Sequence, residues 1–404
     1  MSLSPEEDYE RLTGAVAGES LPVAVVDLDA VDANVERLLG PVRAANKTLR
    51  IASKSVRCVE LLRHIMALDA AVFRGVMSFK VDEAKHLVAS GFDDVFVAYP
   101  SASLRDAETL ASLAATNTVS IAVDDAEHLA VLGPAGAERG VEIPVVIDVD
   151  MSLRWLGDQV HLGVRRSPIA DVDAVLALAR RIRDTAGVRL YGVMGYEAQI
   201  AGMTDDSPFG RLLNLPKRGI KKLSRGPVER LRARIAEVLR ADGFELAMFN
   251  GGGSGSVHWA SAEDALTEVT AGSGFLDSHL FDYYRALDLV PAVFFAVQAV
   301  RRPAPGVVTC HGGGYVASGE AGRDRLPRPY LPAGLELFDL EGAGEVQTPL
   351  RLPAGMTVAL GDPIFFRHAK AGELAEHFAQ YVFVRGDRIV KRAPTYRGEG
   401  CVFL

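Results

Sequence analysis

Cysteine is scarce in this sequence: its 404 residues include only Cys58, Cys310 and Cys401. An odd number of cysteines at such wide spacing predicts neither a disulfide framework nor a zinc motif, and it favours a reducing cytoplasm. No apolar run approaches the ~18 residues of a membrane span, and the acidic start MSLSPEEDYE does not have the character of a secretory signal. The formal net charge is -8 with no basic stripe, so we expect no nucleic-acid partner.

In the first two thirds of the chain, segments with the apolar pattern of a strand alternate with segments that have the apolar period of a helix. Short β-branched apolar runs alternate with longer segments of helical period, as in consecutive βαβ units. The candidate strands are residues 49–55, 73–79, 94–100, 118–125, 143–150, 189–197, 246–252 and 266–272. Strands and helices in this number predict a (β/α)8 TIM barrel, whose catalytic side chains lie at strand C-termini. An open doubly wound sheet is the alternative.

Three segments lie outside this pattern. The apolar run 22–31 has no position in a closed barrel of eight strands, and we expect it in a second domain. After about residue 280, short apolar runs separated by Pro and Gly clusters predict a C-terminal β-rich domain. Residues 198–227 read as a long basic loop, either an active-site flap or a solvated decoration.

Lys54 ends the first candidate barrel strand. A lysine desolvated at a barrel mouth has a lowered pKa and forms imines with aldehydes. Taken alone, a lysine at a strand end is more often simply solvated. A catalytic role therefore depends on what accompanies it.

Two glycine-rich turns follow the last two candidate strands. Such turns bring backbone N–H groups close to an anion without Cβ clashes, and phosphate sites of barrels often lie after these strands. Each turn alone reads as a flexible loop, but together with Lys54 they favour a phosphate-bearing cofactor. The candidate cofactor-binding residues are Gly252, Gly253, Ser254 and Gly255 in the first turn and Gly272, Ser273 and Gly274 in the second.

The chain resembles a known family at this point. The motifs that carry the resemblance are VAVVDLDAVDANVERL, LRIASKSVRC, IDVDMSLRWLG, HLGVRRSP, GVMGYEAQIAG, FNGGGSGS, TEVTAGSGF and GDPIFFRHAKAGELAEHF. They resemble fold type III of the pyridoxal-phosphate enzymes, the alanine racemase type, and within it the D-threonine aldolase and D-serine dehydratase branch. The resemblance implies that residues 1–30 join the β-domain, that 31–279 form the pyridoxal-phosphate barrel, and that 280–404 form a D-serine dehydratase-like domain. It also implies a homodimer with a shared active site.

The same resemblance assigns roles to individual residues. Lys54 matches the lysine that carries pyridoxal 5'-phosphate and acts as acid and base at the substrate's α-carbon. Tyr196 and Glu197 match the family's Tyr-Glu pair, whose tyrosine lies beside the cofactor ring. Arg154 or Arg165 matches an arginine near the ring, and an arginine at the pyridine nitrogen would weaken the ring as an electron sink. Either arginine could instead hold a surface carboxylate.

The metal motif of the branch is altered in this chain. In the relatives, a His followed two residues later by Cys or Asp binds a divalent ion such as Mn, Mg or Zn, whereas here the pair is His368 and Lys370. A lysine ammonium offers no lone pair, so a metal at His368 is doubtful. Lys370 could replace the metal's charge or bind a second substrate carboxylate, Glu373 and His377 could supply ligands instead, or the four could form a solvated helix start.

One further glycine cluster, residues 312–314, lies between His311 and Tyr315. It indicates a close backbone approach to a ligand or to a partner subunit. Cys310 and His311 are neighbours in a strand and therefore face opposite ways, which argues against a Cys-His nucleophile pair.

A lyase is the function that these features favour together. The expected activity is that of an aldolase or dehydratase on a D-configured β-hydroxy amino acid, with Lys54, Tyr196, His368 and Lys370 as candidate catalytic residues. A racemase or epimerase is the first alternative, and it needs a second base opposite Lys54. A non-catalytic pyridoxal-phosphate homeostasis protein is the second, although such proteins are usually a barrel alone.

Overall fold

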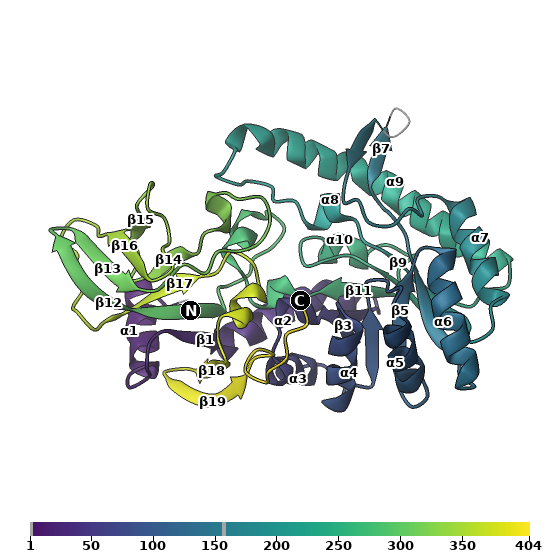
Figure 1. The fold of residues 1–404 in the computed structure, drawn as a ribbon. Coiled ribbons are helices and arrows are strands. Elements are labelled where there is room, and N and C mark those ends of the chain that lie inside the picture. The colour runs from purple at the N-terminus through teal and green to yellow at the C-terminus, as the bar shows by residue number, and fades with distance from the viewer. Residues whose placement is uncertain (1–2, 156–158) are drawn as a thin grey trace. The chain divides into compact units, whose positions relative to one another are not determined.

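The computed structural model describes residues 3–155 and 159–404, which form two compact units (Figure 1). We call them the barrel unit and the β unit. The barrel unit comprises Leu38–Lys54, Met66–Gly272 and Phe403–Leu404. The β unit comprises the chain up to Arg37, Ser55–Ile65 and Ser273–Val402.

Eight parallel strands close the barrel in the order β10-β11-β2-β3-β4-β5-β6-β9. Their bounds are β2 Thr48–Ala52, β3 Phe73–Ser78, β4 Asp94–Val97, β5 Thr118–Val123, β6 Ile143–Asp148, β9 Val188–Gly195, β10 Met248–Gly251 and β11 Glu268–Ala271. Each lies within or one residue beside a run expected from the sequence. The predicted barrel is confirmed, and the open sheet is excluded by the pairing of β11 with β2.

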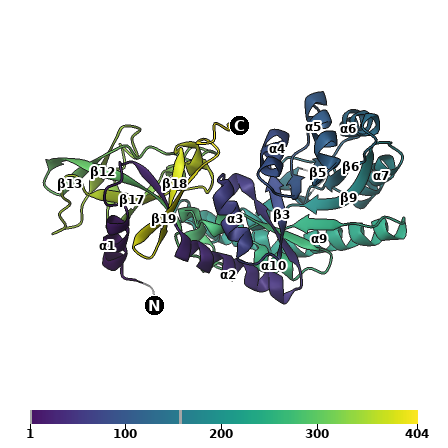
Figure 2. The same ribbon diagram turned by 90° about the horizontal axis from the view of Figure 1, so that it is seen from below.

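Side chains fill the barrel interior, as expected for this fold. Buried apolar groups from facing strands pack together there, among them Phe96, Ala122, Val146, Tyr191 and Met248. Helices α4 to α7 lie side by side outside the strands (Figures 1 and 2). The helices that contribute to this unit are α2 Leu28–Ala44, α3 Val59–Ala67, α4 Val81–Ala89, α5 Leu104–Ala114, α6 Ala126–Glu138, α7 Val172–Arg183, α8 Ala198–Ala201, α9 Asn214–Ala241 and α10 Val257–Ser261, of which α2 and α3 extend into the β unit.

Helix α9 corrects one expectation. Part of the segment that the sequence suggested as a basic loop is the first half of this 28-residue helix, which continues through Pro227. Its buried positions recur at three and four, at Lys221, Ser224, Val228, Arg232, Ile235 and Leu239. Lys221 donates to Asp205 at 2.7 Å, so its charge is paired where it is buried. Burial of the amphipathic face therefore outweighs the low helix propensity of the Gly and Pro residues in this segment. No helix of the described residues is long and apolar enough to cross a membrane.

The β unit contains a nine-stranded sheet whose main path is β15-β16-β13-β12-β1-β18-β19, and β17 pairs with β12 and β14. The bounds are β1 Val23–Asp27, β12 Val293–Ala304, β13 Val307–His311, β14 Arg328–Leu331, β15 Glu336–Leu337, β16 Gln347–Arg351, β17 Pro363–Arg367, β18 Gln380–Arg385 and β19 Arg388–Pro394. Strand β1 lies between β12 and β18 and is buried throughout. Val23 and Val25 of this strand, with Leu12 of α1 (Pro5–Ala15) and Phe365, belong to the core of this unit.

The glycine cluster 312–314 serves packing inside this unit. Gly313 has φ +120°, and a Cβ there would lie 2.6 Å from Oγ1 of Thr348. A Cβ on Gly314 would lie 2.7 Å from the backbone of Glu345. The close backbone approach predicted from the sequence is therefore made to the chain's own residues 344–348. Cys310 is buried and His311 exposed, as expected for strand neighbours, and all three cysteines are free.

Candidate active site at the barrel mouth

Side chains from several strand ends converge at the mouth of the barrel, where the C-termini of its strands lie. Lys54 is in a 3-10 turn directly after β2, and Tyr99 follows β4. The Lys54 Nζ donates a hydrogen bond of 2.9 Å to the Tyr99 hydroxyl. Tyr196 follows β9. Lys54 and Tyr196 were candidates from the sequence, whereas Tyr99 was not.

Arg166, in the loop before α7, adds positive charge to this group. Its guanidinium lies 5.9 Å from the ring centre of Tyr99 and 5.7 Å from that of Tyr196, within the range of cation–π attraction. Burial alone would raise the pKa of Tyr99, but the positive charges of Lys54 and Arg166, with the Lys54 hydrogen bond, lower it overall. The pKa of Tyr196 is instead raised to about 12, by burial and by the neighbouring Glu197. The phenol of Tyr99 therefore loses its proton more readily than that of Tyr196.

Arg154 and Arg165 are the two arginines expected near the ring. Arg154 pairs with Asp150 at 2.5 Å, and Arg165, like its neighbour Arg166, is exposed. The arginine that lies over the two tyrosine rings is Arg166, the next residue in the HLGVRRSP motif. Adjacent arginines in an irregular loop are not distinguished by periodicity, so the motif could indicate only the region.

Carboxyl groups also gather at the mouth. Asp148 ends β6 and Asp124 follows β5. The pKa of Asp148 is raised to about 7, first by burial and then by the negative charge of Asp124, while Arg166 opposes the shift. A carboxyl with such a pKa exchanges protons near neutrality, which is typical of functional sites. Asp148 is not recognisable as a site residue from the sequence, because its strand IPVVID has the pattern of a buried apolar strand.

The conformation of the first glycine turn, residues 252–256, is fixed by hydrogen bonds to Glu197 and within the turn. Gly252 has φ +81°, which disfavours any larger residue. Its N–H donates to Glu197 Oε2 at 3.1 Å, and the N–H of Gly253 donates to the Ser256 hydroxyl at 3.1 Å. A Cβ on Gly253 would lie 3.2 Å from Cε2 of Tyr196, so the turn packs directly against that tyrosine.

A hydrogen bond joins this turn to the second one, residues 271–274. The N–H of Gly272 donates to the Ser254 hydroxyl at 3.1 Å. Ser273 and Gly274 begin a 3-10 turn that belongs to the β unit, where the Ser273 hydroxyl is 3.0 Å from that of Ser55. The two turns, 18 residues apart in the sequence, are thus brought together at neighbouring strand ends.

His368 lies in the β unit directly after β17 and is buried. Within the described part of the chain, neither of its ring nitrogens has a hydrogen-bond partner. Burial, assisted by the charge of Arg367, lowers its pKa to about 3. His368 is therefore a neutral imidazole, as a metal ligand would be.

The neighbours of His368 in sequence do not complete a ligand set. Lys370 Nζ donates to the carbonyl oxygen of Ser318 at 3.0 Å and to its hydroxyl at 3.2 Å. Glu373 accepts from the N–H of Ser318 at 2.8 Å, and the His377 ring packs 4.9 Å from that of Tyr315. In residues 3–155 and 159–404, no group of three or more His, Cys, Asp or Glu side chains is arranged to hold a metal. An imidazole beside a hydrogen-bonded ammonium does not fit a divalent ion.

The fold and the mouth together define a barrel protein with a lysine at a strand end. Comparison with known families is consistent with this: residues 26–276 match the model of the alanine racemase N-terminal domain. The chain belongs to this family, which is fold type III of the pyridoxal-phosphate enzymes, and the resemblance seen in the sequence is confirmed.

Similar proteins include aldolases and a dehydratase. The chain is 27% identical over 304 residues to a D-threonine aldolase from Arthrobacter sp., covering 74% of this chain and 73% of that one. It is 28% identical over 254 residues to a D-threo-3-hydroxyaspartate dehydratase from Delftia sp., covering 62% and 60%. A crystal structure of D-threonine aldolase from Filomicrobium marinum superposes with a TM-score of 0.79 at 21% identity, covering 95% and 96%. These relatives are lyases.

The residues at the mouth fit the cofactor that the family implies. Pyridoxal 5'-phosphate requires an amine for its aldehyde and a small-residue turn for its phosphate. Lys54 supplies an amine anchored by Tyr99, and the turn at Gly252 to Ser256 is kept open by residues without Cβ atoms or with short hydroxyl side chains. The divalent metal, by contrast, has no fitting donor set among the described residues.

Proposed function

We propose that this chain is a pyridoxal-phosphate-dependent lyase that acts on a D-configured β-hydroxy amino acid, as an aldolase or a dehydratase. The observation that carries the proposal is the Lys54 amine, hydrogen-bonded to Tyr99 after the first barrel strand in a chain of this family. The names of the relatives support the substrate class. The β unit is a feature that a barrel-only homeostasis protein lacks.

Lys54 would hold the cofactor covalently through Nζ and, when released, move a proton to or from the substrate's α-carbon. The bound cofactor supplies an electron sink for the α-carbon. Tyr99 orients Lys54 by accepting its hydrogen bond, and the lowered pKa of Tyr99 favours its phenolate form beside the Lys54 ammonium. Tyr196 would pack beside the ring. Arg166 joins Arg154 and Arg165 as a candidate for the arginine near the ring, supported by its position over both tyrosines.

The phosphate would be held by the two joined glycine turns. The candidates remain Gly252, Gly253, Ser254 and Gly255 with Gly272, Ser273 and Gly274. Because the N–H groups of Gly252 and Gly253 are already bonded to Glu197 and Ser256, we propose that these two glycines contribute shape. The later residues of the turns would then supply most of the hydrogen bonds to phosphate.

Labelling of the lysine tests the proposal. The purified protein should absorb in the visible range, and borohydride reduction should attach the cofactor to Lys54. Lys54→Ala should abolish the attachment, whereas Lys85→Ala, at an exposed position on α4, is the matched control and should not. A protein that cannot be loaded, or a label on another lysine, would refute the assignment.

Product analysis distinguishes the two lyase reactions and the racemase alternative. An aldolase breaks the Cα–Cβ bond of D-threonine and gives glycine and acetaldehyde. A dehydratase eliminates the β-hydroxyl and gives, after hydrolysis, a 2-oxo acid and ammonia. Inversion of configuration without either product would replace the proposal by a racemase.

We further propose that Lys370 supplies the positive charge that a metal supplies in the relatives, with His368 beside it in sequence. A fixed cation at a developing oxyanion is worth roughly 3 kcal/mol, or a hundredfold in rate. Lys370→Met should therefore lose about that factor while keeping the visible absorbance, and chelation should leave the natural protein active. A stoichiometric divalent ion whose removal abolishes activity would contradict this role. The Lys370→Cys variant should gain metal affinity by creating a His-x-Cys pair.

The cytoplasmic location expected from the cysteine content and the homodimer expected from the resemblance stay predictions. Light scattering of the purified protein tests the dimer.

A further inference from the structure

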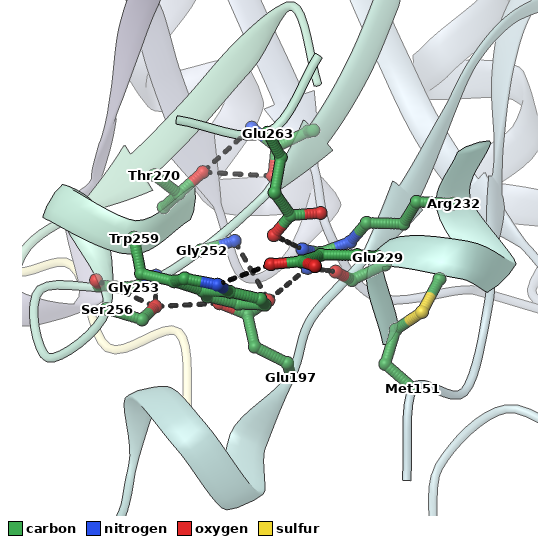
Figure 3. A network of polar contacts seen from close by, with 12 residues as sticks. Met151, Glu197, Glu229, Arg232, Gly252, Gly253, Ser256, Trp259, Glu263 and Thr270 are labelled. Carbon is green, nitrogen blue, oxygen red and sulfur yellow. Dashed lines mark hydrogen bonds and ion pairs between the residues drawn. The ribbon is translucent and has the colours of Figure 1, made fainter. Parts of the chain in front are cut away.

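A buried ionic network lies behind the first glycine turn (Figure 3). Its centre is Arg232 of α9, which has no exposed side-chain surface. Arg232 Nη2 donates to Glu197 Oε2 and, at 2.5 Å, to the carbonyl oxygen of Gly195, while Nη1 donates to Glu263 at 2.5 Å. One side chain thus connects the helix, the end of β9 and the loop before β11.

The Glu197 carboxylate transmits this network to the turn. Its Oε2 accepts the N–H of Gly252 at 3.1 Å, and its Oε1 accepts the Ser256 hydroxyl at 2.7 Å. The same hydroxyl accepts the N–H of Gly253. The first two N–H groups of the turn and the hydroxyl that closes it are therefore fixed, directly or through Ser256, by one carboxylate.

Burying a charge triad of this kind rarely adds stability over apolar packing, because desolvation offsets the attraction between the charges. Its geometric effect is more specific. Glu197 can hold the turn only while Arg232 neutralises and orients it, and Tyr196, the preceding residue, packs against Gly253 from the same strand end. Gly251 leaves room for the arginine, since a Cβ there would lie 2.7 Å from Nη2.

We propose that Glu197 and Arg232 are positioning residues that hold the first glycine turn in the shape that receives the cofactor's phosphate. The inference rests on the proposed function and adds Arg232 and Ser256 to its machinery. The side chains of Glu197 and Arg232 have no exposed surface, so both act through the backbone of Gly252 and Gly253. The network therefore selects a phosphorylated cofactor over the same aldehyde without phosphate.

The test compares two ligands, pyridoxal 5'-phosphate and pyridoxal, on the full chain freed of cofactor. Both ligands react with Lys54, but only the first uses the phosphate turns. We expect Arg232→Met and Glu197→Gln to lower the ratio of the two affinities at least tenfold. Ser256→Ala, which removes only a hydroxyl and keeps the buried charges paired, should fold readily and lower the ratio severalfold.

The matched control is Arg50→Met. Arg50 is equally buried in the same barrel and is held by Glu268 and Asp94. Its loss should destabilise the protein without changing the affinity ratio. Trp259, whose ring lies 5.7 Å from the Arg232 guanidinium, gives a fluorescence signal that reports whether the network is intact in each variant.

The outcomes separate the two proposals. Natural protein that binds neither ligand at Lys54 would refute the proposed function itself. Normal binding with an unchanged ratio in Arg232→Met, Glu197→Gln and Ser256→Ala would refute the positioning role alone. An equal fall of the ratio in Arg50→Met would show a general effect of barrel stability and would also refute it. Partial restoration of the ratio by Arg232→Lys, relative to Arg232→Met, would support it.

Discussion

Two buried arginines in the barrel unit have similar partners and different surroundings. Arg50 and Arg232 have side-chain exposures of 1% and 0%, and each is held by two carboxylates. The partners of Arg50 are Glu268 and Asp94, the first residues of β11 and β4. The partners of Arg232 are Glu197, after the end of β9, and Glu263, in the loop before β11.

The difference lies in what each network reaches. Glu268, held by Arg50 at 2.8 Å, also accepts from the side chain of Asn250, so this network ties barrel strands to one another. The Arg232 network ends on backbone N–H groups of a turn at the mouth. Barrels place stability at the N-terminal end of their strands and chemistry at the C-terminal end. A triad of one arginine and two carboxylates thus stabilises the barrel strands at Arg50, whereas at Arg232 it holds a turn of the candidate active site.

Arg50→Met should have the largest effect on stability. It leaves Glu268 and Asp94 buried without their cation, and breaking a buried ion pair in this way costs about 3–5 kcal/mol. Urea unfolding of the natural protein and the variant measures the difference. A stable variant that has lost its preference for pyridoxal 5'-phosphate over pyridoxal would break the comparison.

Gly252→Val, beside the Arg232 network, and Gly75→Val, beside the Arg50 network, should have different effects, the first on cofactor retention and the second on stability. At Gly252, φ is +81°, so valine distorts the turn and should weaken cofactor retention roughly tenfold, or about 1.4 kcal/mol. At Gly75, beside Arg50, a Cβ would lie 2.3 Å from the carbonyl oxygen of Asp94, so valine should lower stability instead. Cofactor titration and thermal melting check the pair, and equal cofactor loss in both variants would contradict the assignment.

Glu263, one of the two carboxylates that hold Arg232, should make its own contribution to the pH dependence of stability. Burial raises the pKa of Glu263 to about 7 from its ordinary value of 4.5, although Arg232 opposes the shift. A raised pKa means that the folded state prefers the protonated form, so the stabilisation is complete below about pH 4.5 and is lost as the pH rises through about 7.

Glu263→Gln mimics the protonated carboxyl and should remove that part of the pH dependence. Unfolding free energies measured from pH 4.5 to 8 for both proteins give the difference. Asp148 and Asp277, whose pKa values are also raised to about 7, contribute equally to both proteins and cancel. Parallel stability curves for the two proteins would show that Glu263 does not titrate in this range.

The smallest effect is expected at an exposed ion pair. Arg180 of α7 pairs with Asp242 at 2.6 Å, and the arginine side chain is 51% exposed. Because water screens such pairs, Arg180→Ala should change neither the melting temperature nor the cofactor affinity measurably. A clear loss of stability would show that charge pairing matters here irrespective of burial.

Much of the fold follows from local sequence patterns. Alternating β-branched runs and helical periods encode the eight barrel strands, because both patterns arise from side-chain direction within a single element. Helix α9 is the exception. Gly219, Gly226 and Pro227 suggest a break, but packing of its buried face, in part against α7 and α8, overrides this local preference.

For the site, the sequence by itself predicts Lys54 and the two glycine turns from contiguous motifs with their own chemistry, and it predicts the Tyr196-Glu197 pair from the family resemblance. Only the tertiary structure decided that Tyr99 meets Lys54 and that Arg232 meets Glu197, 45 and 35 residues apart in the chain. Barrel closure brings strand ends together, and Arg232 of helix α9 reaches the end of β9. Neither contact is visible in any local window of the sequence. Which arginine faces the tyrosines was decided in the same way, because the path of an irregular loop depends on the surface on which it packs.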